Sequence, residues 1–414
     1  MGERWQLTPP GTRDLLPDEA SRSREVVDAV LGLLRRWGYR EVVTPTLEYL
    51  DVLVRGEGTE AADRLFKLID RGGELLALRP EMTTPVARLV ATQLRHEPLP
   101  IRLAYAGQVF RGGEPGAGRL REFPQVGCEL VGADSPEADA EIVALAVEAL
   151  RAAGVGQFSL SVGHGGFLRS LLEGLGVSEE EMGHVRAALY RKDFVGLQAV
   201  LDRYALPAGG REALLALPSL RGPEALREAR DLVGARPGAE ALQALEELLE
   251  MVRAYGVDDR VTIDLSIIRD FDYYTGIVFE GHTSSLGVPL LGGGRYDRLL
   301  ERFGVPYPAT GFALRIERVL AAEAPGTARR APDVVVAFDG GGREAALRYA
   351  SVLRSRGLVV EVEVRRRPWD DVVREALARG AAQAVFVRSG DALVRDGTGD
   401  ERRVSLGSLA GALP

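Results

Sequence analysis

Apolar residues recur every three or four positions in several stretches of the first part of the chain, which predicts amphipathic helices. These stretches span residues 18–37, 84–94 and 135–153. Asp18, directly after a proline, is expected to cap the first helix, and Ser135 the third. Gly38 and Gly154 follow the last periodic residues and are expected to end these two helices.

Other stretches alternate between apolar and polar residues, which is typical of half-buried strands. They span residues 39–50, 101–111, 123–132, 260–267 and 274–282. Pro45 is expected to break the first of these strands. A Gly- and Pro-rich loop joins the second and third strands, which predicts a long antiparallel hairpin over 101–132. Beyond them, "LGGGRYD" (291–297) reads as a turn and "TGFALRIERVLAA" (310–322) as a strand that leads into a helix.

The remaining segments predict the domain organisation. Residues from about 157 to 257 are rich in Leu, Ala, Glu and Arg and are mostly helical in pattern, as expected for an inserted helical domain. Residues 323–333 have linker composition, and strand and helix patterns alternate after them. We therefore predict an α+β core over 1–330, with its helical insertion, and a small α/β domain over 331–414.

Composition restricts the class of protein. The 414 residues are 46% hydrophobic, and the net charge of −8 does not favour a large nucleic-acid footprint. Cys128 is the single cysteine, which excludes an internal disulfide and fits a reducing compartment. The N-terminus does not read as a secretory signal, and no apolar run approaches the ~20 residues that a spanning helix needs. We expect a soluble cytoplasmic protein without a membrane partner.

The first candidate site residues are Glu81 and Thr83, two positions apart just before a predicted helix. In an extended segment they would point to one side, where a carboxylate beside a hydroxyl suits a ligand ammonium group. The alternative is purely structural. In that case Thr83 or Thr84 caps the helix and Glu81 faces solvent.

The predicted hairpin carries polar residues on a strand face that should be apolar. Gln125, Gly127 and Glu129 alternate and so share one face, and Arg111 ends the opposite strand. Burying such groups without partners costs a few kcal/mol each, on the order of 1–3. They are therefore exposed, bound to a ligand, or paired with each other, and an internal ion pair of Arg111 with Glu129 is the structural alternative.

The segment "IRDFDYYTGIVFEGH" (268–282) contributes Arg269, Tyr273 and Tyr274, whose tyrosines are equally compatible with core packing and with a ligand site. Further along the chain, the three glycines of "LGGGRYD" would let another group approach the backbone closely. No phosphate-binding glycine pattern or P-loop lysine is present, no His-His pair suggests a metal, and no nucleophile triad is signalled. The sequence therefore predicts no catalytic residues, no metal and no cofactor.

Several segments, in this order, resemble histidyl-tRNA synthetase and its class II relatives. They are "PPGTRDLLP", "LRPEMTTPVAR", "FRGGEPGAGRLREFPQVGCELVG", "IIRDFDYYTGIVFE", "GGGRYD" and "GFALRIERV". "RPEMTTPVAR" is more similar to a paralogous branch of the family, the regulatory subunits of ATP phosphoribosyltransferase, which serve histidine biosynthesis. The resemblance implies an antiparallel sheet flanked by helices and a dimer formed through the first helix and the strand at Pro45.

The resemblance also implies a histidine pocket. By position, Glu81, Thr83 and Gln125 would hold the α-amino group, Arg269 would lie near the carboxylate, and Glu129 and Tyr274 would read the imidazole. "GGGRYD" would form part of the wall. With the strand-end arginine and the second tyrosine added, the predicted histidine-binding residues are Glu81, Thr83, Arg111, Gln125, Glu129, Arg269, Tyr273 and Tyr274.

The departures from the synthetase pattern fall in its ATP half. Glu114 stands where synthetases carry an arginine, and a carboxylate should repel phosphates. Arg315 replaces a glycine and should occlude the nucleotide, and Asp270 replaces another glycine beside Arg269. The amino-acid half is kept.

We therefore predict a non-catalytic regulatory subunit of a glycosyltransferase, ATP phosphoribosyltransferase. It would form a homodimer within a larger hetero-oligomer with a short-form catalytic subunit, and histidine would be its feedback effector. The C-terminal domain resembles an anticodon-binding domain, which favours the alternative of a functional histidyl-tRNA synthetase. Its 13 Arg against 7 Asp and 5 Glu lack the basic excess of a tRNA reader, so tRNA is not expected as a partner. A histidine-binding module with another partner is the third reading.

Overall fold

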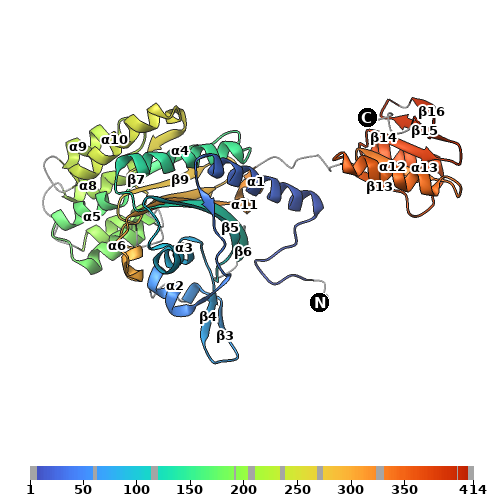
Figure 1. Ribbon diagram of the computed structural model, residues 1–414. Helices are drawn as coiled ribbons and strands as arrows, with labels where there is room; N and C mark the ends of the chain where they lie inside the picture. Colours follow the sequence, from blue (N-terminus) through green and yellow to red (C-terminus); the bar gives the residue numbers. More distant parts are fainter. Residues whose placement is uncertain are drawn as a thin grey trace. The chain divides into compact units, whose positions relative to one another are not determined.

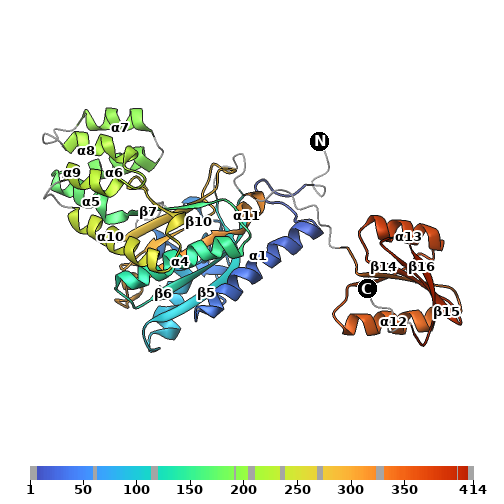
Figure 2. The ribbon, with the colours of Figure 1, turned by 90° about the horizontal axis from the view of Figure 1, so that it is seen from above.

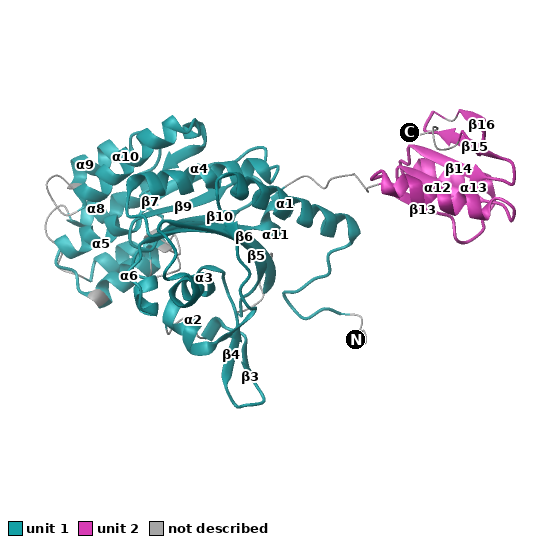
Figure 3. Cartoon of the chain, in the orientation of Figure 1, with its two compact units in different colours: residues 1–324 teal, residues 325–414 magenta. Residues whose placement is uncertain are grey.

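The chain forms two compact units, residues 1–324 and 325–414 (Figure 3). The structure is a computed structural model, and it describes residues 7–58, 63–112, 120–190, 193–203, 210–233, 238–267, 274–322, 331–398 and 400–408. The division between the units falls within the segment of linker composition. Each unit has hydrophobic clusters of its own.

An eight-stranded sheet is the centre of the first unit. In spatial order its strands are β1 (Arg40–Glu41), β5 (Ile101–Phe110), β6 (Glu122–Val131), β11 (Ala309–Arg315), β10 (Leu291–Arg295), β9 (Ile277–His282), β7 (Ser159–His164) and β8 (Val261–Ile263). Neighbours pair antiparallel except β1 with β5 and β7 with β8, which are parallel. The long β5–β6 pair runs from Ile101 opposite Val131 to Phe110 opposite Glu122, so the predicted hairpin is confirmed.

The two faces of this sheet have different covers, because successive side chains of a strand point to opposite sides. On one face Ala104, Val126 and Cys128 pack in a core with α1 (Pro17–Arg36) and α4 (Pro136–Ala152). On the other, Tyr105 and Phe123 pack in a second core that includes residues of α3 (Thr83–Leu89). Figures 1 and 2 show α1 and α4 along one face of the sheet, with α3 on the opposite face in Figure 1.

A three-stranded sheet leads directly into α3. Its order is β2 (Leu47–Tyr49), β4 (Leu75–Leu78), β3 (Lys67–Ile69), and α2 (Leu50–Glu57) follows β2. After β4, the buried Arg79 donates hydrogen bonds to the carbonyl oxygens of Thr44 and Gln108, which ties this sheet to β5. A π-helical turn, η3 (Val90–Leu94), continues α3, and a 3₁₀ turn, η6 (Leu300–Phe303), packs near it.

Helices fill most of the segment between β7 and β8. They are α5 (Gly165–Gly174), α6 (Glu179–Tyr190), α7 (Phe194–Leu201), α8 (Gly210–Ala216), η4 (Leu217–Ser219), α9 (Ala225–Val233), α10 (Ala239–Ala254) and η5 (Asp258–Arg260). Their apolar faces extend the core that begins under α4. The first part of the predicted 157–257 segment is not helical, because β7 pairs with β9 in the main sheet.

The second unit alternates strands and helices as its pattern predicts. It contains β12 (Val334–Phe338), α12 (Arg343–Ser355), β13 (Val360–Val362), α13 (Trp369–Ala378), β14 (Gln383–Val387), β15 (Asp391–Asp396) and β16 (Glu401–Ser405). The first three strands are parallel, and the β14–β15–β16 end of the sheet is antiparallel. The helices cover opposite faces of the sheet, α12 in one core and α13 in the other.

Two local predictions are wrong, and one holds in part. Asp18 does not cap α1, because the helix begins at Pro17 and Asp18 lies in its first turn. The strand is broken around Pro45 as predicted, but its two short parts, β1 and β2, belong to different sheets. The "LGGGR" residues form strand β10 rather than a turn, because they are flanked by β9 and β11, and a Cβ on Gly293 would lie 2.2 Å from the Gly311 carbonyl oxygen. Ser135, in contrast, caps α4 as predicted, accepting a hydrogen bond from the Ala138 N–H.

Candidate functional site

Glu129 is the centre of a buried polar cluster on the α3 side of the main sheet. Its side chain is 1% exposed. Thr83 Oγ1 donates to Glu129 Oε1 at 2.8 Å, Tyr105 Oη donates to the same oxygen at 3.1 Å, and Tyr296 Oη donates to Oε2. Burial raises the pKa of Glu129 to about 8, although these hydroxyl donors oppose the shift. Of these residues, Tyr105 is not among the sequence predictions, and Tyr296 is predicted only as part of the "GGGRYD" wall.

Glu81 is buried and holds the start of α3. Its carboxylate accepts hydrogen bonds from the backbone N–H groups of Thr83 and Thr84, the latter at 2.8 Å. The purely structural alternative, with a threonine cap and Glu81 in solvent, is therefore wrong, because Glu81 is 4% exposed and supplies the acceptors itself. The arrangement leaves the Thr83 hydroxyl to reach Glu129, and so brings both carboxylates to one place.

Gln125 lies four residues before Glu129 on β6, on the same face of the strand. It is 3% exposed, and its amide oxygen has no hydrogen-bond partner among the described residues. Leaving a buried polar group unpaired costs about 1–3 kcal/mol. A ligand that donates a hydrogen bond at this position would remove that cost.

The described part of the predicted tyrosine pair lies beside the cluster. The rings of Tyr274 and Tyr296 pack edge to face, with centroids 6.4 Å apart. Gly294 makes this possible, because a Cβ there would lie 3.0 Å from the Tyr274 ring and its φ is +153°. Arg269 and Tyr273 lie outside the described residues.

Arg111 does not form the proposed ion pair with Glu129. Its Nε donates to the Pro80 carbonyl oxygen at 3.1 Å, and its guanidinium lies 5.7 Å from the centre of the Phe123 ring. The hydroxyl groups around Glu129 occupy its carboxylate instead. Arg111 therefore stands next to the Glu81 segment, at the edge of the cluster.

The Arg315 guanidinium covers the ring of Phe123, which lies on β6 on the same strand face as Gln125 and Glu129. Its guanidinium carbon lies 3.7 Å from the ring centre, and its Nη2 pairs with Glu317 Oε1 at 2.7 Å. Burial lowers the pKa of Arg315 to about 9. The Arg315 side chain therefore lies over the Phe123 ring and is held there by Glu317. Residue 114 and Asp270 lie outside the described ranges.

Two hollows lie away from this cluster. One is in the second unit, beside Glu363 and Arg367. Another is lined by Gln108 of β5, by Glu317 of α11 (Ile316–Ala322) and by residues of the N-terminal segment. In the described ranges, no group of three or more His, Cys, Asp or Glu side chains is arranged to hold a metal ion. No helix in the described part of the chain is long and apolar enough to cross a bilayer.

Comparison with known proteins agrees with this architecture. The profile of the histidyl-tRNA synthetase family matches residues 11–319. An ATP phosphoribosyltransferase regulatory subunit from Moorella thermoacetica is 45% identical over 376 residues, covering 90% of this chain and 96% of the relative. A second protein of that description, from Desulforamulus reducens, is 42% identical over 91% of this chain and 94% of its own length.

Solved structures show the same fold. A Bacillus halodurans protein described as an ATP phosphoribosyltransferase regulatory subunit/histidyl-tRNA synthetase superposes with a TM-score of 0.82 at 34% identity, covering 92% of this chain and 98% of its own. Histidyl-tRNA synthetase from Nostoc sp. superposes with a TM-score of 0.81 at 23% identity, over 98% of both chains, which is a likeness of fold.

Proposed function

The chain belongs to the histidyl-tRNA synthetase family, among the regulatory subunits of ATP phosphoribosyltransferase, and from this premise we propose that it is a non-catalytic subunit that binds histidine. It assembles with a short-form catalytic subunit and takes part in the first step of histidine biosynthesis. Histidine bound near Glu129 acts as its feedback effector.

The observation that supports the histidine site is the unpartnered amide oxygen of the buried Gln125, on the strand face that also carries the buried Glu129. Free histidine brings an α-ammonium group and imidazole N–H groups, all of them donors. The ammonium suits Gln125 and Glu81. The carboxylate of Glu81 accepts two backbone N–H groups and still has free lone pairs for a further donor. The imidazole suits Glu129, with Tyr274 beside it. Arg269, proposed to lie near the ligand carboxylate, and Tyr273 complete the proposed set of ligand residues.

Arg315 is the main argument for a subunit that does not catalyse a reaction with ATP. A nucleobase gains about 1–3 kcal/mol by stacking on an aromatic ring, and the Phe123 face is already covered by the Arg315 guanidinium. The carboxylate of Glu114 adds repulsion of phosphate groups. The alternative, a functional synthetase, requires histidine-dependent exchange between ATP and pyrophosphate, which this arrangement opposes.

Feedback requires histidine to bind with different affinity in the active and inhibited assemblies. A coupling of about 1–3 kcal/mol is sufficient for useful control. The proposed assembly is a homodimer of this chain within a larger hetero-oligomer. If the chain and the catalytic subunit do not co-purify after co-expression, or if histidine leaves the activity of the complex unchanged, the regulatory proposal is wrong.

The binding site itself is tested by calorimetric titration of L-histidine into wild-type protein and Gln125→Met. We expect at least a tenfold weaker dissociation constant in the variant. Gln383→Met is a matched control, because Gln383 is also buried with an unpartnered amide oxygen but lies on β14 in the second unit. Equal affinity in wild type and Gln125→Met, or an equal loss in both variants, contradicts the assignment.

A further inference from the structure

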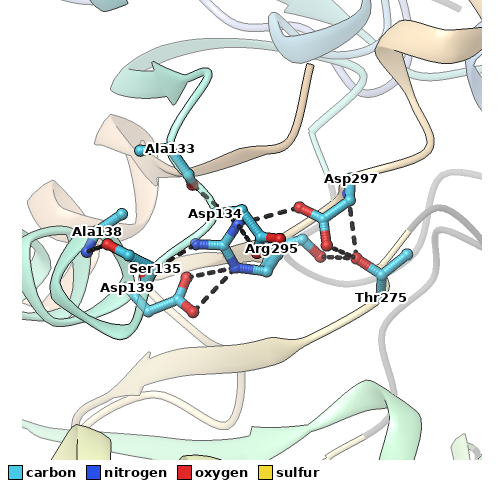
Figure 4. Close-up of polar contacts among 8 residues, drawn as sticks. All are labelled: Ala133, Asp134, Ser135, Ala138, Asp139, Thr275, Arg295 and Asp297. Carbon is cyan, nitrogen blue, oxygen red and sulfur yellow. Dashed lines mark hydrogen bonds and ion pairs between the residues drawn. The ribbon is translucent and has the colours of Figure 1, made fainter. Parts of the chain in front are cut away.

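Arg295, at the end of β10, has a buried guanidinium with an acceptor on every nitrogen (Figure 4). Nε donates to both Asp139 oxygens, at 2.9 and 3.1 Å. Nη1 donates to Asp297 Oδ1 at 3.0 Å and to the Ala133 carbonyl at 3.1 Å, and Nη2 donates to the Ser135 carbonyl at 3.3 Å. Such a group is held in one orientation, because each bond lost would leave a buried donor unpaired.

These acceptors connect two parts of the fold. Asp139 lies in the first turn of α4, and Ser135 is the cap of that helix. Asp297 lies two residues beyond Arg295 and is one-third exposed. Burial opposes the charge of Arg295, but the carboxylates of Asp139 and Asp297 more than offset it and raise the pKa of the guanidinium above its ordinary value. The guanidinium therefore stays charged and keeps β10 attached to the start of α4.

The same network holds the segment that begins at Tyr274. The Thr275 N–H donates to the Arg295 carbonyl oxygen at 2.8 Å, and Thr275 Oγ1 donates to Asp297 Oδ2 at 2.9 Å. The Asp297 N–H donates back to Thr275 Oγ1 at 3.1 Å. Gly276 lies against the Arg295 stem so closely that a Cβ there would be 2.9 Å from Arg295 Cδ. Figure 4 shows Asp297 between Arg295 and Thr275.

Two tyrosines of the candidate site, Tyr274 and Tyr296, are direct chain neighbours of this network. Tyr274 precedes Thr275, and Tyr296 lies between Arg295 and Asp297. Tyr296 donates to Glu129 and packs edge to face with Tyr274. Because the network fixes the backbone at Thr275 and at Arg295–Asp297, it also fixes the backbone positions from which the Tyr274 and Tyr296 side chains extend.

We propose that Arg295, Asp139, Asp297 and Thr275 form a positioning network that sets the ligand affinity of the Glu129 cluster through Tyr274 and Tyr296, without touching the ligand. This inference rests on the proposed histidine site. The sequence predicts no role there for Asp139 or Thr275, and it includes Arg295 and Asp297 only as part of the "GGGRYD" wall. A purely structural network would affect the stability of the protein and leave the rings and the affinity unchanged.

The test uses the full chain with Asp297→Ala, Thr275→Val and, as a milder change, Asp297→Asn. Glu141→Gln is the matched control, because Glu141 lies two residues from Asp139 on α4 and pairs with Arg102 and Tyr39 instead. We expect L-histidine to bind about tenfold or more weakly to Asp297→Ala and Thr275→Val, with Asp297→Asn between them and wild type. The control should stay within about twofold of wild type.

A second readout is independent of histidine. Protein labelled with 3-fluorotyrosine gives ¹⁹F resonances, which Tyr274→Phe and Tyr296→Phe assign. In the ligand-free protein, Asp297→Ala and Thr275→Val should shift or broaden these two resonances, and Glu141→Gln should not. If wild type binds histidine, unchanged affinity in both variants overturns the inference. If wild type does not bind it, the proposed function fails, and unmoved ¹⁹F resonances overturn the positioning role separately.

Discussion

Tyr296 and Glu129 are 167 positions apart in the chain and share a buried hydrogen bond. Glu129 lies on β6 and Tyr296 directly after β10, and β11 pairs with both strands. Thr83, from the start of α3, reaches the other oxygen of the same carboxylate. One acidic side chain thus connects the main sheet, the α3 helix that covers this face of it, and the segment that follows β10.

Glu129→Gln should change how stability depends on pH. The folded protein holds the Glu129 proton up to about pH 8, whereas the unfolded chain releases it near the ordinary pKa of 4.5. Between these values the folded state binds more protons, so the free energy of unfolding falls as pH rises, by up to about 1.4 kcal/mol per pH unit from this group. The variant should lack this component when urea unfolding is followed from pH 5 to 8.

Glu141→Gln is the control for this variant. The contribution of Glu141 to stability depends on pH with the opposite sign. Burial opposes ionisation of Glu141, but hydrogen bonds from Arg102 and Tyr39 prevail and lower its pKa. Its stabilisation is present above the ordinary pKa and is lost as pH falls below it. Parallel pH curves for wild type and Glu129→Gln would contradict the assigned ionisation of Glu129.

Arg315→Gly should open the Phe123 ring to a nucleotide. Stacking of a base on the freed ring is worth about 1–3 kcal/mol, so ATP affinity should rise about tenfold or more in a fluorescence or calorimetric titration. Arg315→Met keeps a long neutral side chain over the ring and should show no such gain. A gain in Arg315→Met equal to that in Arg315→Gly would mean that charge, not coverage of the ring, excludes the nucleotide.

Glu81→Ala should destabilise the protein and also weaken histidine binding. The N–H groups of Thr83 and Thr84 lose their acceptor, which costs about 0.5–2 kcal/mol for a lost helix cap. Asp193→Ala removes the cap of α7, where the Asp193 carboxylate accepts from the Gly196 N–H at 2.7 Å, at a comparable cost and outside the Arg295 network. Denaturation and titration of both variants should show similar losses of stability but weaker histidine binding only in Glu81→Ala. Equal histidine affinities would remove Glu81 from the site.

Gly127→Ala should be poorly tolerated. An added Cβ would lie 2.1 Å from the Phe312 carbonyl oxygen and 2.8 Å from the Tyr105 hydroxyl, so β6 and β11 would have to separate. Overpacking of this kind costs about 1–3 kcal/mol. Gly156→Ala, which meets nothing within 4 Å, is the control. Thermal or urea unfolding that ranks the two variants equally would contradict this packing.

Local patterns predicted much of the fold correctly. The α4 helix with its Ser135 cap, the β5–β6 hairpin and the β11 strand leading into α11 (Ile316–Ala322) are where the spacing of apolar residues indicates. Patterns failed where a neighbour far away in the chain decides. The glycines of β10 read as a turn because nothing local shows the two strands that enclose them. The sequence indicated Glu81 as a site residue but not as the acceptor for the first N–H groups of α3, because that role depends on its burial.

Most helices and strands and the family resemblance can be recognised in the sequence alone, because helix and strand periods and motif residues are properties of neighbouring positions. The sequence also indicates Glu81, Thr83, Gln125, Glu129 and Tyr274 as site residues. Their partners become visible only in the folded chain. Tyr105 and Tyr296 meet Glu129, Arg315 covers Phe123, and Arg295 anchors Thr275, because strand pairing brings together residues whose separation in the chain carries no signal of contact.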